Sequence, residues 1–134
     1  PSAEAFSRDF QAAYNRPAVG PGLQTMYDAA AITLLAMQAA PKLDGPSIRD
    51  ALRAVQDPQG EVVGTGVDGL KKGLDALKAG KKIRYVGATG AFTFDKNGDV
   101  IGPMLVWKVQ GGNIVTERTF TTEEMQAIEK KVGL

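Results

Sequence analysis

The first eighty residues repeat apolar side chains at helical spacing. Phe6, Phe10 and Tyr14 follow one another at intervals of four residues, which places them on one face of a helix. Similar stripes recur three more times before Gly80, and proline or glycine ends most of them. The pattern predicts four helices, at 2–16, 26–40, 47–55 and 67–79.

The second of these helices is apolar around nearly its whole circumference. Met26 and Leu34 belong to its main stripe, and Ile32 and Leu35 fill other sides. A helix with this pattern is largely buried in a protein core. Thr25 precedes it and is a suitable N-terminal cap, so we expect the helix to begin at Met26.

After Gly80 the pattern loses its helical period. Short apolar runs now alternate with polar residues, which is typical of strands. The run 95–99 is rich in Asp, Asn and Gly and predicts a turn. We expect extended segments at 84–86, 91–94, 104–109 and 114–120.

Two local signals organise the end of the chain. Gly111, Gly112 and Asn113 separate the last two extended segments and predict a hairpin turn. Thr121 with Glu124 three residues later is a capping box, which opens a final helix. Helices therefore lead, strands follow and a helix closes, so the fold class is α/β.

The composition excludes several kinds of chemistry. The 134 residues contain no histidine and no cysteine, which excludes a Ser-His-Asp triad, a cysteine nucleophile, a disulfide and a thiolate or imidazole zinc site. Sixteen basic and 15 acidic residues leave a net charge of +1, so there is no electrostatic case for nucleic acid as a partner. No apolar run approaches the roughly 20 residues of a membrane span.

Two short motifs have the outline of ligand sites, but neither is complete. The 64–69 run matches the G-x-G-x-x-G phosphate loop, yet 61–63 is too short and polar for the buried strand that should precede it. Asp95, Asn97 and Asp99 begin like a calcium loop, but valines stand at its sixth and twelfth positions. We therefore expect no cofactor and no metal, and favour a loop before a helix and a hairpin turn.

A polar pair, Tyr27 and Asp28, lies near the start of the second helix. It could line the edge of a cleft, but a carboxylate in a first turn also interacts favourably with the helix dipole without any ligand. The sequence leaves a ligand role open for Tyr27 and favours the structural role for Asp28. No pair of carboxylates suited to acid–base catalysis is visible from the spacing, so we expect no enzyme.

Three stretches of the chain together resemble a known family. The first joins the aromatic spacing of the first helix to the run Met-Tyr-Asp-Ala-Ala at 26–30, and the second is Ile-Arg-Asp-Ala-Leu at 48–52. The third and most specific runs from Tyr85 through Asp99 and continues with Val-Trp-Lys-Val at 106–109. In this order they resemble the C-terminal third of type I periplasmic substrate-binding proteins of the branched-chain amino-acid (Leu/Ile/Val) class, which serve ABC transporters.

The resemblance implies a fragment of a two-lobed fold that closes on a small ligand at its hinge. Residues 1–104 would be the C-terminal part of lobe 1, and 105–134 would supply a crossover strand, a hairpin and a helix returning to lobe 2. The loop that follows the first helix would line the cleft, so Leu23, Gln24 and Tyr27 are the implied ligand-binding residues. The chain starts with proline rather than methionine, and we expect the first two thirds of the family's chain to be missing from it.

The resemblance also implies a function. The protein would be the periplasmic or extracytoplasmic solute-binding component of an ABC importer, binding amino acids or related small carboxylates by lobe closure. Its partners would be that ligand, the transporter's membrane subunits, and the missing N-terminal part of the same protein or a second copy. The isolated chain would expose Ile32, Leu35 and Trp107. The alternative is a self-contained α/β interaction domain that dimerises through its strands.

Overall fold

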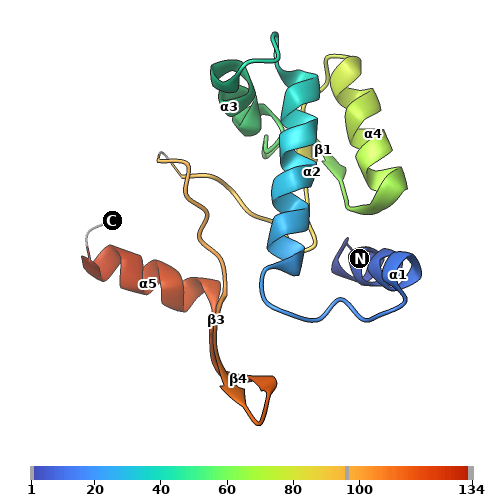
Figure 1. Cartoon of the computed structure of the whole chain (residues 1–134). Coiled ribbons are helices and arrows are strands. Elements are labelled where there is room, and N and C mark those ends of the chain that lie inside the picture. Colours follow the sequence, from blue (N-terminus) through green and yellow to red (C-terminus); the bar gives the residue numbers. More distant parts are fainter. Residues whose placement is uncertain (1, 96, 133–134) are drawn as a thin grey trace. The chain divides into compact units, whose positions relative to one another are not determined.

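The computed structural model describes residues 2–95 and 97–132, and the chain divides into two compact units, Pro1–Ala91 and Phe92–Leu134. The elements of the first unit are α1 (Ser2–Tyr14), α2 (Leu23–Ala39), α3 (Gly45–Ala54), β1 (Glu61–Val63), α4 (Gly66–Lys78) and β2 (Ile83–Tyr85) (Figure 1). The elements of the second unit are β3 (Met104–Gln110), β4 (Asn113–Phe120) and α5 (Thr122–Val132). The predicted α/β class is confirmed, and α1, α3 and α4 lie within two residues of their predicted bounds.

The start of α2 differs from the prediction. The helix begins at Leu23, and its cap is Gly22, whose φ of 82° lies in the left-handed region. The prediction that Thr25 caps this helix is wrong, because Thr25 lies inside its first turn. Glycine adopts a positive φ without steric cost, so Gly22 turns the chain into the helix three residues earlier than a side-chain cap would have done.

The buried face of α2 also differs from the expected one. Met26 and Leu34 are 70% and 57% exposed, whereas Ile32 and Leu35 are 5% and 1% exposed. The main stripe therefore lies on the exposed side of α2, and the expected exposure of Ile32 and Leu35 is wrong. Apolar residues surround α2, so periodicity alone does not select the face that meets the sheet. In Figure 1, α2 lies between α3 and α4, and it contacts both.

A β–α–β unit forms the centre of the first unit. Strands β1 and β2 are parallel, with Val63 opposite Tyr85, and α4 connects them. A loop was expected before the helix that starts near residue 67, so the strand β1 at 61–63 was not predicted from the sequence. Three of its core side chains, Val63, Ile83 and Tyr85, have almost no exposed surface. A strand of three residues is stable here because it pairs with β2 and buries Val63 in the core.

Helix α4 approaches this core through Gly73, which is buried. A Cβ atom at Gly73 would lie 2.9 Å from Leu35 Cδ2 and 3.4 Å from Val63 Cγ2. The absence of a side chain there lets the helix pack closely against α2 and the sheet. The predicted glycine end of α4 is confirmed, since Gly80 has a φ of 73°.

In the second unit, β3 and β4 form an antiparallel hairpin with a register shift between Val106 and Trp107. The predicted turn is confirmed: Gly111 and Gly112 have φ angles of 58° and 80°, as a tight two-residue hairpin requires. Every residue of β3 is exposed, including Trp107 at 46%, as expected for that side chain.

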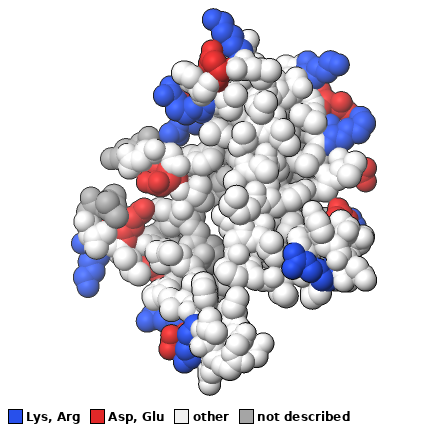
Figure 2. Space-filling model, in the orientation of Figure 1, with Lys and Arg blue, Asp and Glu red and all other residues white. Residues whose placement is uncertain are grey.

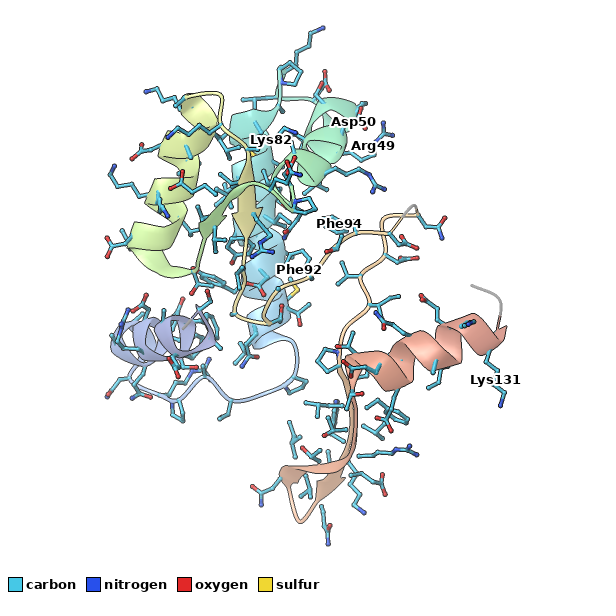
Figure 3. The ribbon with its side chains drawn as sticks, turned by 180° about the vertical axis from the view of Figure 1, so that it is seen from behind. Arg49, Asp50, Lys82, Phe92, Phe94 and Lys131 are labelled. Atoms are coloured by element: carbon cyan, nitrogen blue, oxygen red, sulfur yellow. The ribbon has the colours of Figure 1, made fainter. Side chains whose placement is uncertain are left out.

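The 95–99 turn is confirmed as well. Asp95 Oδ1 accepts hydrogen bonds from the backbone N–H groups of Asn97 and Asp99, both at 2.8 Å. The preceding 91–94 segment forms a single bridge, from Phe94 to Val100, rather than a strand. The rings of Phe92 and Phe94, labelled in Figure 3, meet edge to face with centroids 5.8 Å apart.

Candidate functional site

The three residues assigned to the ligand site lie in the first turns of α2. Leu23, Gln24 and Tyr27 are all half-buried. The backbone N–H groups that begin this helix receive no side-chain cap from Gly22. The assignment of these residues to ligand binding remains a prediction.

A hollow of about 290 Å³ opens between α1 and α2. Leu23 and Tyr27 line it, whereas Gln24 is not among its lining residues. Most of the lining residues belong to α1. The spacing of its aromatic residues predicted a helix face but no role for them in a ligand site. The aromatic, charged and larger aliphatic side chains that line the hollow are Phe6, Asp9, Phe10, Tyr14, Leu23 and Tyr27.

The aromatic rings of the hollow form one continuous series. Centroids lie 5.0 Å apart for Tyr27 and Phe6, 5.8 Å for Phe6 and Phe10, and 4.7 Å for Phe10 and Tyr14. Neighbouring rings are tilted by 44–57°, within the range in which aromatic pairs attract one another. The sequence feature that could have indicated this wall of the hollow is that the residues at four-residue spacing along α1 are aromatic rather than aliphatic.

Tyr27 also fixes the loop before α4. Its hydroxyl accepts a hydrogen bond of 2.9 Å from the backbone N–H of Gly66. The hydroxyl of Thr65 donates to the carbonyl of Ser2 at 2.7 Å, which ties the same loop to α1. In a phosphate loop the N–H of Gly66 would point to the ligand, so these contacts favour the structural interpretation of the G-x-G-x-x-G motif.

The other member of the polar pair, Asp28, is 4% exposed and accepts four hydrogen bonds. The donors are the hydroxyl of Tyr85, the N–H of Ala88, and the N–H and hydroxyl of Thr89, at 2.6–2.8 Å. Burial and the neighbouring Asp28 carboxylate raise the pKa of Tyr85 well above its usual range. The helix-dipole role expected for Asp28 is wrong, because α2 begins at Leu23 and Asp28 lies beyond its first turn. Spacing along the chain does not reveal the hydrogen-bond donors, which lie about sixty positions away.

Gly87 completes this contact. A Cβ atom at Gly87 would collide with the carboxylate of Asp28. Only glycine therefore lets the 87–90 loop approach α2 closely enough for its backbone N–H groups to reach that carboxylate. Asp28 acts as the anchor of this loop, and its oxygen atoms are occupied by the chain itself.

A second hollow, of about 430 Å³, lies along α4. Four of its six charged lining residues form two ion pairs: Lys71 bonds to Asp75, and Lys72 Nζ lies 3.1 Å from Glu61 Oε1. Figure 2 shows basic residues (blue) and acidic residues (red) interspersed on the face that it draws, with no large patch of one charge among the described residues there. Within the described residues there is no group of three or more His, Cys, Asp or Glu side chains placed to hold a metal ion.

The sequence matches no protein-family model and no curated protein. Among solved structures, the leucine-binding protein LivK of Thermotoga maritima matches with a TM-score of 0.56 and 20% sequence identity. The match covers 92% of this chain but only 27% of that protein. The chain therefore has the fold of one part of a periplasmic-binding-protein type I fold, as the sequence resemblance implied.

None of the helices in 2–95 and 97–132 is long and apolar enough to cross a membrane. The longest, α2, has 17 residues.

Proposed function

We propose that this chain is the C-terminal part of an extracytoplasmic solute-binding protein that serves an ABC importer. It would bind an amino acid or a related small carboxylate and would release it unchanged, so no enzymatic activity is proposed. Residues 1–104 would belong to one lobe, and 105–134 would return to the other. Its partners would be the transporter's membrane subunits and the missing N-terminal part of the same protein or a second copy, and its location would be periplasmic or extracytoplasmic.

The observation that carries this proposal is the extent of the structural match. Nearly the whole chain follows one part of a leucine-binding protein, while most of that protein has no counterpart here. Strand β3 supports the same interpretation, because Leu105 and Val109 are 60% and 65% exposed, and Val106 on the other face is 44% exposed. A strand that is apolar on both faces is typical of a sheet covered from both sides.

The assignment of Leu23, Gln24 and Tyr27 to the ligand site belongs to this proposal. Ligand closure in such proteins shifts an equilibrium between open and closed lobes, and residues of the cleft wall favour the closed state by contacting the ligand. Leu23 and Tyr27 line a hollow, which supports a contact role for both.

Calorimetric titration of the natural full-length protein tests the proposal. The panel contains leucine, phenylalanine, glutamate and succinate, with glucose as a ligand that has no carboxylate. We expect at least one carboxylate to bind, and Leu23→Ala or Tyr27→Phe to weaken that binding by about tenfold. Leu34→Ala is the matched control, since Leu34 is an exposed leucine of the same helix. Failure of the whole panel to bind would contradict the proposal.

The exposed hairpin also favours the alternative, an interaction domain in which two copies pair through β3 and β4. Light scattering of the 134-residue chain tests it. A dimer that Val109→Lys dissociates would support the alternative, because that exposed side chain lies in β3. A monomer at every concentration would contradict it.

A further inference from the structure

The hollow between α1 and α2 has the chemistry of a cation site. Four aromatic side chains line it, and the face of an aromatic ring attracts a cation because the ring carries negative charge above its plane. The aromatic rings also provide apolar area for the body of a ligand. An uncharged polar ligand would gain little from such walls.

One aromatic ring of this series already contacts a cation of the protein itself. The guanidinium of Arg16 lies over the ring of Phe10, 5.5 Å from its centroid. Arg16 itself is exposed and does not line the hollow, whereas Phe10 does. The geometry indicates that a cation can reach the aromatic series from solvent.

The only acidic side chain among the lining residues is Asp9. Its Oδ1 atom lies 2.9 Å from Arg8 Nη2 and accepts a hydrogen bond of 3.0 Å from Arg8 Nε. The Arg8 side chain is 75% exposed, and an exposed ion pair of this kind contributes little to stability. A ligand cation that approaches Asp9 therefore competes with a weak partner.

From these features we infer that the hollow binds an organic ammonium ion with an apolar body, with the charge at Asp9 and the body against the aromatic series. The volume of about 290 Å³ suits a ligand of about ten non-hydrogen atoms, near the lower end of small-molecule sites. The inference rests on the proposed function in that Leu23 and Tyr27 belong to both sites. It assigns recognition of the ammonium group to the hollow, whereas the proposed function requires only that the whole protein bind an amino acid or a related small carboxylate.

Nuclear magnetic resonance titration of the full 134-residue chain tests the inference. The probes are phenethylammonium and phenylacetate, which has a similar body and the opposite charge. We expect phenethylammonium to shift resonances of α1 and of the start of α2, and phenylacetate to leave them unchanged. Equal shifts with both aromatic probes, or none with phenethylammonium, would overturn the inference.

Two substitutions with opposite expected effects sharpen the test. Asp9→Asn removes the negative charge and should weaken phenethylammonium binding by about fivefold, whereas Arg8→Gln removes the competing cation and should strengthen it by a few-fold. The matched controls lie on α3, where Arg49 and Asp50 make the same contact between neighbours at 2.7 Å (Figure 3). Asp50→Asn and Arg49→Gln should leave the affinity unchanged; an equal effect of the control substitutions would overturn the role of Asp9.

The outcomes separate this inference from the proposed function. If leucine or another carboxylate binds the full-length protein and phenethylammonium does not bind the hollow, the inference fails and the proposed function stands. If phenethylammonium binds with the expected dependence on Asp9 and no carboxylate of the panel binds the full-length protein, the proposed function fails and the cation site stands.

Discussion

The hydroxyl of Tyr85 donates a hydrogen bond of 2.8 Å to Oδ1 of Asp28, and both residues are buried. Tyr85 ends β2, whereas Asp28 lies in the second turn of α2. The same carboxylate holds Ala88 and Thr89, which follow β2. One acidic side chain therefore joins the central helix, the sheet and the last loop of the first unit.

Replacing Asp28 should destabilise the first unit strongly. Asp28→Ala leaves buried donors of Tyr85 and Ala88 without their acceptor, and each such donor costs about 1–3 kcal/mol. We expect the free energy of unfolding in urea to fall by at least about 2 kcal/mol. Asp50→Ala is the control, because its exposed carboxylate should matter by less than about 0.5 kcal/mol. Similar losses in both variants would contradict the anchoring role of Asp28.

Tyr85 should make stability depend on alkaline pH. Its pKa is raised in the folded state, so the unfolded chain loses the tyrosine proton first, at about pH 10. The stabilisation from Tyr85 is complete below that pH and is lost as the pH rises above it.

Urea unfolding at several pH values from 8 to about 11 measures this effect. The difference in stability between the wild type and Tyr85→Phe should shrink as the pH rises, because phenylalanine has no proton to lose. Tyr14→Phe is the control, since Tyr14 is 64% exposed. A difference that stays constant across this range would show that Tyr85 does not titrate as argued.

The close approach of α4 predicts that Gly73 tolerates no branched side chain. Gly73→Val would place methyl groups against Leu35 and Val63 in a packed core, and overpacking of this kind costs about 1–3 kcal/mol. Gly45→Val is the control, because nothing lies within 4 Å of a Cβ atom there. Thermal unfolding of both variants checks the prediction, and equal stabilities would refute it.

The capping box should decide the local stability of α5, which has no buried residues. Thr121 Oγ1 accepts from the N–H of Glu124 at 3.2 Å, and Glu124 Oε2 accepts from the N–H of Thr121 at 2.9 Å. Thr121→Ala should cost about 1 kcal/mol and speed amide exchange in α5 by about fivefold. Thr119→Ala, in β4, should leave exchange in α5 unchanged. Unaltered exchange in Thr121→Ala would mean that other contacts hold the helix.

Local signals were sufficient for much of the fold. Gly80 at the end of α4, the Gly111–Gly112 turn and the capping box at Thr121 depend on backbone conformation and on neighbours a few residues away. The boundaries of α1 and α3 follow from apolar spacing and proline in the same way. Such features are encoded within one or two turns of chain, so they were predicted correctly.

The candidate site was predicted less completely. Leu23 and Tyr27 were placed at a ligand site by resemblance, and the structure shows that both line a hollow. The positions of Phe10 and Asp9 in the wall of this hollow were not predicted. Spacing places residues on a face of a helix but does not indicate which other helix packs against that face. Strand β1 was missed because its three residues gain their pairing from β2, twenty-two positions later.

The sequence by itself determined the α/β class and most of the helices and the hairpin, and these 134 residues contain no histidine or cysteine for chemistry that depends on them. Only the tertiary structure decided which face of α2 is buried and what Asp28 does. A helix that is apolar on all sides has no preferred face until its partners are in place. The face was selected by a buried carboxylate that requires hydrogen-bond donors, and those donors, Tyr85 to Thr89, come from a distant part of the chain.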